Sequence, residues 1–304
     1  MMKSVHFMQY QKRISLSGTA LRARKVLFSG LIITFCSVFV YPQKPEMRVA
    51  TLDGSKIRYY DLGNTKAKNA LVFVHCWTCN VEFWKDSYRA FPNYRVIAMD
   101  LPGHGESDKP KTDYSMEYFA RAVNAVMENA GVSKGVLVGH SMGTPITRRF
   151  YELYPNKTLG LVIVDGALLP FGDRAQIEGF FEPLFKDYKS GAPAFIDGML
   201  QPAWPDFRPF IRTSMLATEG YVAQSAMKQM LDDSYAAHGT INVPVLALMA
   251  PNPMWPSDLE ARYKAVAPKL EFQKWTGVSH FLHMERSAEF NGQVKAFIIR
   301  NRLL

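Results

Sequence analysis

Short apolar runs alternate with amphipathic segments along most of the chain. The expected strands lie at 71–74, 95–99, 136–138, 159–164, 243–249 and 270–275. Most are continuous apolar runs, which are typical of strands covered on both faces. The expected helices lie at 115–129, 144–154, 257–266 and 286–300. Strands that alternate with helices predict an α/β protein with a mostly parallel central sheet, flanking helices and right-handed crossovers.

Two stretches depart from this alternation. Residues 47–52 and 56–62 alternate around Asp53-Gly54, a dipeptide typical of tight hairpin turns, so we expect an edge hairpin to open the domain. From 168 to 240, prolines and aromatic residues replace the strand pattern, and we interpret this stretch as a helical cap over the carboxyl edge of the sheet. The predicted division is a leader at 1–41, a core in two parts at 42–167 and 241–304, and a cap at 168–240.

Much of the positive charge lies at the amino end. The chain has 36 Lys and Arg against 27 Asp and Glu, a formal net charge of +9. Six of the basic residues and none of the acidic ones precede residue 42, which leaves 30 against 27 for the remainder. The body of the chain therefore requires no polyanionic partner, and we expect no nucleic-acid binding.

The basic residues flank a mostly apolar stretch at 26–40. Basic residues followed by an apolar stretch are typical of a secretory signal. The stretch is shorter than the roughly 17 to 25 residues of a spanning helix. No small-residue cleavage site follows it, because 39–42 is bulky. We expect export to the periplasm or the medium, with an uncleaved membrane anchor at 26–40 as the alternative.

The sequence Gly139-His140-Ser141-Met142-Gly143 predicts a nucleophile at Ser141. An apolar run precedes it and a predicted helix follows at once. In a strand-turn-helix of this kind, the sharp turn lifts the serine Oγ out of the sheet. The free N–H groups of the helix N-terminus lie beside Ser141 and could hold an oxyanion. G-x-S-x-G also occurs by chance in glycine-rich turns, so the interpretation depends on the surrounding residues.

The carboxyl ends of the predicted strands carry the other candidate groups. Ligands of parallel sheets bind beyond these ends. They hold His75, Asp100, Ser141, Asp165, Asn252 and His280.

With these residues the chain resembles the α/β-hydrolase family over roughly residues 45 to 300. The likeness is carried by His75-Cys76-Trp77 and by the stretches 100–107, 139–143 and 277–285. It implies the α/β-hydrolase fold, with Ser141 as nucleophile and His280 as general base. It also implies an oxyanion hole formed by the main-chain N–H groups of Trp77 and Met142, and no metal or organic cofactor.

The chemistry of serine supports a histidine base independently. A hydroxyl is a weak nucleophile unless a base removes its proton, and imidazole titrates near neutral pH. His283 is the rival base, but it lies three residues further into the turn, so we prefer His280. His104 and His140 are expected to order loops by hydrogen bonds, and His75 to shape the loop that it begins.

The acid is where the sequence departs from the commonest pattern of the family. The family usually carries Asp shortly after the strand at 243–249, yet no carboxylate follows here before Asp258. A second arrangement in the family places the acid at the end of the preceding strand, where Asp165 stands. We favour Asp165, which would fix the imidazole tautomer. The alternatives are Asp258, a site without an acid, and a purely structural turn at Asp165.

Cys76 is a second departure, because the family usually has glycine there. Glycine permits close backbone approach, so the loop beside the oxyanion is expected to differ in shape. Cys76 and Cys79 form C-x-x-C, but a zinc site needs a second pair, which Cys36 cannot supply. Three cysteines form no disulfide framework, and the sequence leaves open whether Cys76 and Cys79 are oxidised.

Together these residues predict a serine hydrolase of carboxylic esters or related acyl compounds. Apolar side chains of the predicted cap, with Trp255, favour an apolar acyl or ring-bearing substrate, or else form the core of the cap itself. These cap residues are Met199, Leu200, Trp204, Phe207 and Met215. A serine nucleophile argues against the dehalogenases and epoxide hydrolases that resemble this chain. Lactone, thioester and carbon–carbon bond hydrolysis, perhydrolysis, and a receptor-like protein without turnover stay open.

Overall fold

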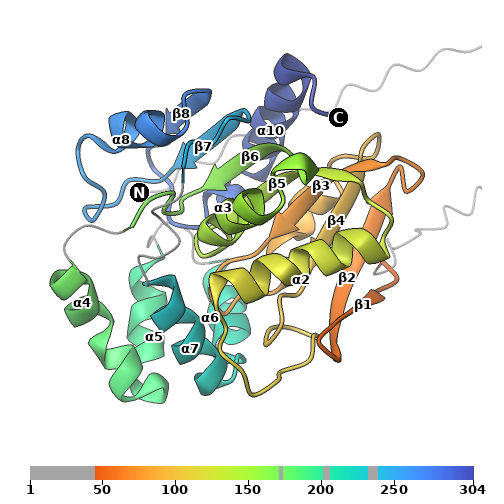
Figure 1. Ribbon diagram of the computed structural model, residues 1–304. Coiled ribbons are helices and arrows are strands. Elements are labelled where there is room, and N and C mark those ends of the chain that lie inside the picture. Colours follow the sequence, from red (N-terminus) through yellow and green to blue (C-terminus); the bar gives the residue numbers. More distant parts are fainter. Residues whose placement is uncertain (1–44, 171–173, 201–205, 232–238) are drawn as a thin grey trace, which may run out of the picture. The chain divides into compact units, whose positions relative to one another are not determined.

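The computed structural model describes residues 45–170, 174–200, 206–231 and 239–304 (Figure 1). The predicted leader at 1–41, with its apolar stretch at 26–40, lies outside these residues. Within them, no helix has both the length and the apolar character needed to span a bilayer.

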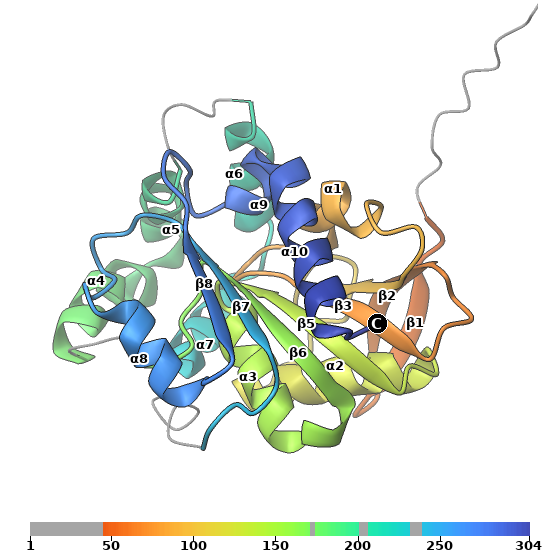
Figure 2. The same cartoon turned by 90° about the horizontal axis from the view of Figure 1, so that it is seen from above.

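A sheet of eight strands occupies the centre of the described chain, in the order β1-β2-β4-β3-β5-β6-β7-β8 (Figure 2). β1 (Arg48–Leu52) and β2 (Ser55–Gly63) form the predicted hairpin, whose turn residues Asp53 and Gly54 both have positive φ. The other strands are β3 (Asn69–Val74), β4 (Arg95–Met99), β5 (Lys134–His140), β6 (Thr158–Val164), β7 (Val245–Met249) and β8 (Leu270–Lys274). β2 pairs antiparallel with β4, and every pairing from β4 through β8 is parallel. The predicted mostly parallel sheet is confirmed.

Both faces of the sheet are buried. Along β3, Val72 and Val74 belong to one apolar cluster, whereas Leu71 and Phe73 belong to the other. This period of two is that of an extended strand. Burial on both sides explains why most strands are continuous apolar runs in the sequence.

Helices cover the two faces, as predicted (Figure 2). α2 (Met116–Asn129), α3 (Gly143–Leu153) and α8 (Leu259–Val266) contribute buried side chains to the first cluster. α1 (Lys85–Tyr88) and α10 (Ser287–Asn301) contribute theirs to the second. Ser115 accepts a hydrogen bond from Tyr118 N–H (3.1 Å) and so caps the N-terminus of α2, which begins where the pattern places it.

Between β6 and β7 the described residues form four helices, here called the inserted helices. They are α4 (Arg174–Lys186), α5 (Tyr188–Gly198), α6 (Arg208–Leu216) and α7 (Gly220–Met230). They gather to one side of the sheet (Figure 1). Their side chains share a cavity with residues at the carboxyl ends of β5 and β6, so they lie over that edge.

Some element boundaries differ from the predicted ones. β7 begins at Val245, two residues late, because Pro244 has no N–H with which to pair. The closing helix is preceded by a separate turn, α9 (Leu282–Glu285). Two 3-10 turns, η1 (Val81–Trp84) and η2 (Pro155–Lys157), and the single turn of α1 were not predicted. Elements of three or four residues are too short to display a hydrophobic period.

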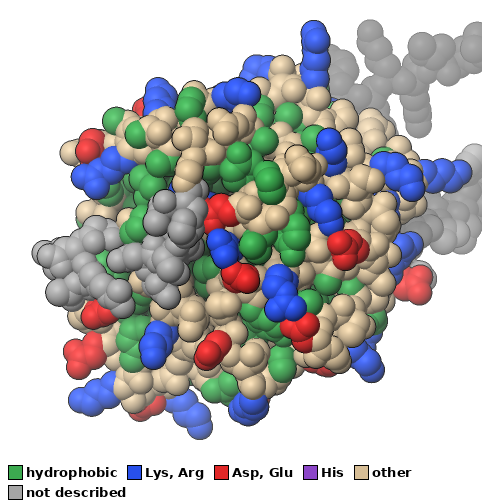
Figure 3. Space-filling view, viewed as in Figure 1, with side chains coloured by type: hydrophobic (Ala, Val, Ile, Leu, Met, Phe, Trp, Pro, Cys, Tyr) green, Lys and Arg blue, Asp and Glu red, His purple; other side chains and the backbone are tan. Residues whose placement is uncertain are grey.

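The surface carries charges of both signs. On the face shown in Figure 3, Lys and Arg side chains are interspersed with Asp and Glu. Among the described residues, exposed ion pairs join Arg262 with Asp258 and Lys264 with Glu260.

Candidate active site

Ser141 occupies the sharp turn between β5 and α3. Its φ of +52° lies in the left-handed region, which is uncommon for a residue with a side chain. Ser141 N–H donates to Val164 O (2.9 Å) and Ser141 O accepts from Thr144 N–H (2.8 Å), so both sides of the turn are held. A Cβ at Gly143 would lie 2.4 Å from Val74 O, so glycine is what lets the helix approach the strand this closely. The segment thus forms a strand-turn-helix with Ser141 at its apex.

His280 and Asp165 are joined by a direct hydrogen bond. Asp165 follows β6 and is 2% exposed, and His280 lies in the loop between β8 and α9. Their atoms Nδ1 and Oδ2 are 2.6 Å apart. An ionised carboxylate only accepts hydrogen bonds, so Nδ1 carries the ring proton and Nε2 keeps its lone pair. The imidazole of His280 is therefore set to accept a proton at Nε2.

The second oxygen of Asp165 is also engaged. Oδ1 accepts from Ala250 N–H (3.0 Å) and from Trp255 Nε1–H (3.3 Å), both in the segment that follows β7. These two donors fix the orientation of the carboxylate, which leaves Oδ2 to face His280. The sequence placed Trp255 beside the site because of its position after this strand, but did not indicate that it would donate to Asp165.

The two alternative residues lie elsewhere. Asp258 precedes α8, where its side chain is 56% exposed and pairs with Arg262 Nε at 2.8 Å. The ring of His283 packs on Trp84, with their ring centroids 4.3 Å apart, and is 1% exposed. Neither residue lines the cavity that contains Ser141. Geometry therefore favours Asp165 and His280 over both.

Three other histidines hold loops through hydrogen bonds. His75 Nε2 accepts from Leu101 N–H (2.9 Å), His104 Nδ1 lies 3.0 Å from Pro102 O, and His140 Nε2 lies 2.8 Å from His280 O. Burial lowers the pKa of His75 and of His140 well below the usual value, and that of His104 to about 4. These rings are neutral at pH 7, and the bond from His140 holds the backbone of His280.

We expect acid to destabilise the fold through these buried histidines. Burial, followed by the nearby His280, lowers the pKa of His283 to about 3. In the unfolded chain that pKa returns to about 6.5, so below this pH the unfolded state binds protons that the folded state does not. The free energy of unfolding should then fall by about 1.4 kcal/mol per pH unit for each such histidine. Burial raises the pKa of Asp100 to about 6, and this opposes the trend between pH 6 and 4.

His283→Phe tests this prediction and also the rival base. The unfolding free energy, measured with urea between pH 4.5 and 7, should fall less steeply with falling pH in this variant, because one histidine fewer takes up a proton on unfolding. Ester turnover at pH 7.5 should stay within about twofold, because the ring lies outside the cavity. An unchanged pH slope would refute the shifted pKa, and loss of turnover in a folded variant would make His283 the base.

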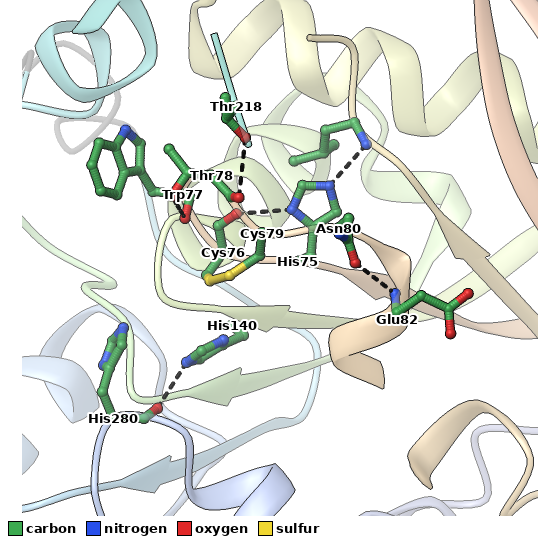
Figure 4. Close-up of a disulfide and its surroundings, with 11 residues drawn as sticks. His75, Cys76, Trp77, Thr78, Cys79, Asn80, Glu82, His140, Thr218 and His280 are labelled. Atoms are coloured by element: carbon green, nitrogen blue, oxygen red, sulfur yellow. Dashed lines mark hydrogen bonds between the residues drawn. A yellow bond between two sulfur atoms is a disulfide. The ribbon is translucent and has the colours of Figure 1, made fainter. Parts of the chain in front are cut away.

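Trp77 lines the same cavity as Ser141, and Met142 is the next residue after Ser141 in the chain. Met142 follows Ser141 at the start of α3, where the first N–H groups of a helix have no partner within it. Trp77 lies in the loop after β3, and its indole Nε1–H donates to Ala223 O of α7 (2.8 Å). Cys76 and Cys79, whose oxidation the sequence left open, are joined by a disulfide across this loop (Figure 4).

A cavity of about 880 Å³ brings these groups together. Ser141, Asp165, His280 and Trp77 line it, together with Asn252 from the turn after β7. His75 and Asp100, also at strand ends, do not: Asp100 instead accepts from Val81 N–H (2.8 Å) and Glu106 N–H (2.9 Å). The rest of the lining is mostly apolar, including Phe180, Phe181, Leu184, Phe195, Met199, Leu200, Met215, Met227, Met230, Met254 and Trp255.

Three of the five apolar cap residues singled out in the sequence, Met199, Leu200 and Met215, line this cavity. Phe207 packs against the core cluster instead, and Trp204 lies outside the described residues. The phenylalanines of α4 and α5 were missed as lining residues, because a helix that is apolar on several sides does not reveal which side faces a cavity. Among the described residues, no three His, Cys, Asp or Glu side chains group so as to hold a metal ion.

Comparison with known proteins agrees with this topology. Residues 69–196 match the family model of the alpha/beta hydrolase fold. The chain is 38% identical over 119 residues to a non-heme chloroperoxidase of Streptomyces lividans, an alignment that covers 38% of this chain and 43% of that protein. It is 33% identical over 124 residues to a bifunctional esterase/perhydrolase of Acinetobacter calcoaceticus, covering 40% and 45%. The chain thus spans less than half the length of these relatives.

A solved structure extends the likeness to most of the described chain. An esterase from Rhodococcus sp. ECU1013 superposes with a TM-score of 0.70 at 22% identity, over 83% of this chain and 98% of that one. Likeness at this identity concerns the fold. The sheet order, the matched segment and this structural likeness together show that the chain has the α/β-hydrolase fold.

Proposed function

We propose that the chain is a serine hydrolase that cleaves carboxylic esters or related acyl compounds. The observation that carries the proposal is the bond from His280 Nδ1 to Asp165 Oδ2, made beside a serine that lines the same cavity. Nucleophile, acid and base follow in the chain order of this fold. Asp165, Ser141 and His280 would act as a catalytic triad.

The reaction would proceed through an acyl-enzyme. Ser141 Oγ attacks the acyl carbon while His280 Nε2 takes its proton, and Asp165 stabilises the imidazolium that forms. The main-chain N–H groups of Trp77 and Met142 would stabilise the oxyanion. The tetrahedral intermediate collapses, and the leaving alcohol takes the proton from His280. Water then gives a proton to Nε2 and attacks the acyl carbon. The second tetrahedral intermediate collapses as His280 returns this proton to Ser141 Oγ, which releases the acid and restores the free serine.

The substrate is proposed to be uncharged and apolar around the scissile bond. Among the described residues that line the cavity, Asp165 is the only carboxylate and there is no Lys or Arg. Such a cavity would bind an apolar acyl chain or ring and would desolvate a charged group without compensation. The inserted helices, which supply most of the apolar lining, would act as the cap. On the face shown in Figure 3 the charges of both signs are interspersed, which agrees with the proposal that the partner is a small molecule and not a nucleic acid.

Other reactions of the fold remain alternatives to ester hydrolysis. A lactone, a thioester or an activated carbon–carbon bond presents the same carbonyl carbon to Ser141, and peroxide could replace water in the second step. A carboxylate nucleophile, as in the epoxide hydrolases of this fold, has no counterpart at position 141. The other class of function is a receptor that binds an ester-like ligand without turnover. The altered acid turn after β7 and Cys76 are its best support.

Hydrolysis of p-nitrophenyl acetate and butyrate by the full chain tests the proposal. We expect nitrophenol release with both esters and faster turnover of butyrate, because its longer chain buries more apolar surface. A fluorophosphonate should inactivate the protein at one equivalent, with the added mass on the peptide that contains Ser141. Ligand binding without nitrophenol release and without an adduct would point to the receptor instead.

Export is proposed from the sequence alone. In residues 1–41 a basic segment is followed by an apolar one, and this order would direct the chain out of the cytoplasm. The basic segment itself would stay on the cytoplasmic side of the membrane. Outside the cytoplasm a disulfide such as Cys76–Cys79 persists.

A further inference from the structure

We propose that the Cys76–Cys79 disulfide positions the main-chain N–H of Trp77 in the oxyanion hole, so that reduction of this bond slows catalysis. The inference rests on the proposed function, because it assigns that N–H to the oxyanion. It makes the cysteine pair a positioning element at the place where the family usually has glycine.

The disulfide closes a small covalent ring around Trp77 and Thr78. The two Cα atoms are 5.2 Å apart, and Cys79 N–H donates to Cys76 O at 3.2 Å, so the same turn is closed twice. Cys76 is 2% exposed and Cys79 is fully buried. Cys76 also lines the cavity beside Trp77 and Ser141, so the crosslink lies at the wall of the site.

The direction of the Trp77 N–H follows from the carbonyl of Cys76. Both belong to one planar trans peptide, in which N–H and C=O point in opposite directions. Cys76 O accepts a hydrogen bond from Cys79 N–H and also lies 2.8 Å from His75 Nδ1 (Figure 4). The other ring nitrogen of His75, Nε2, accepts from Leu101 N–H. His75 therefore carries its proton on Nδ1 and donates to Cys76 O. With the carbonyl held on one side, the N–H of Trp77 is aimed to the other.

The backbone of this turn is strained and needs support. Thr78 has φ of +56°, in the left-handed region that is unfavourable for a β-branched residue. Its hydroxyl donates to Trp77 O (2.8 Å), and Thr218 Oγ1 donates to Thr78 O (3.1 Å) (Figure 4). These are hydrogen bonds, whereas the disulfide is the covalent link across the turn. Without it, two unbonded thiols must separate and Thr78 can relax, which would turn the neighbouring peptides.

Reduction is a balanced two-electron exchange with a small dithiol. The dithiol loses its two S–H hydrogens and closes to a cyclic disulfide, while the Cys76–Cys79 bond breaks and each sulfur gains one proton. Because Cys76 lines the cavity, a small dithiol could reach the bond through the space that admits substrate.

The experiment compares oxidised and reduced chains in a Cys36→Ser background, where only the pair can react. Kinetics with p-nitrophenyl butyrate and the rate of fluorophosphonate inactivation are measured before and after dithiothreitol, with thiols counted after denaturation. We expect reduction to lower kcat and the inactivation rate about 10- to 100-fold, since loss of a whole oxyanion donor costs about 10²–10³. KM should change less than about threefold, because the apolar lining that binds substrate is unaltered.

Two variants separate positioning from simple stabilisation. Cys79→Ser should have the low kcat of the reduced chain. The double variant Cys76→Gly with Cys79→Ala places glycine beside the oxyanion hole and should recover part of kcat. Its kcat should not change when dithiothreitol is added. Where Cys79→Ser does not fold, the reduced chain is assayed at a temperature at which circular dichroism shows it folded. A reduced, folded chain with unchanged kcat but lower Tm would overturn the inference. If the oxidised chain shows neither ester turnover nor a fluorophosphonate adduct, the proposed function itself is overturned.

Discussion

Ser141→Ala is expected to lower kcat for p-nitrophenyl butyrate by at least about 10³-fold, because the variant cannot form an acyl-enzyme. The residual rate would come from substrate binding and the oxyanion donors alone. The fluorophosphonate adduct should disappear completely. Kinetics of the purified variant and mass spectrometry of the treated protein measure the two effects.

Ser115→Ala is the matched control. This serine also lies in the turn that leads into a helix, but it caps α2 and does not line the cavity. Its loss should cost about 1 kcal/mol of unfolding free energy and leave kcat within about twofold. If Ser141→Ala keeps a tenth of the activity and still takes up phosphonate, the nucleophile is another residue and the proposed mechanism fails.

The fold and the apex of the site could be predicted because their causes are local. Continuous apolar runs report strands buried on both faces, as the split of β3 between two clusters illustrates. Gly139 and Gly143 mark the sharp turn, since a Cβ at either position would meet backbone at 2.4 Å. Asp165 could be singled out because strand ends in a parallel sheet gather at one edge.

The features of the site that could not be predicted depend on contacts between segments that are far apart in the sequence. The donors to Asp165 Oδ1 come from 85 and 90 residues away, and no pattern in the sequence pairs them. The position of His283 outside the cavity depends on its packing on Trp84, which lies in a short 3-10 turn that has no visible period in the sequence. The side of α4 and α5 that faces the cavity is likewise decided by how those helices pack.

Asp165→Asn is expected to lower kcat by about 10³- to 10⁴-fold with KM nearly unchanged. Ala250 N–H and Trp255 Nε1–H both donate to Oδ1, so an asparagine would keep its carbonyl oxygen there. Its NH₂ group would then face His280 Nδ1, which would have to accept instead of donate. The ring proton moves to Nε2, and His280 can no longer take the proton of Ser141.

Asp258→Asn is the control for this prediction. Its carboxylate makes one exposed pair with Arg262, worth at most about 1 kcal/mol, and does not line the cavity. The variant should keep kcat within about twofold and the unfolding free energy within about 0.5 kcal/mol. Steady-state kinetics of both variants at pH 7.5 decide the assignment. If Asp258→Asn loses activity and Asp165→Asn keeps it, the acid has been placed on the wrong strand, and the hydrogen bond at 2.6 Å serves only to hold the loop.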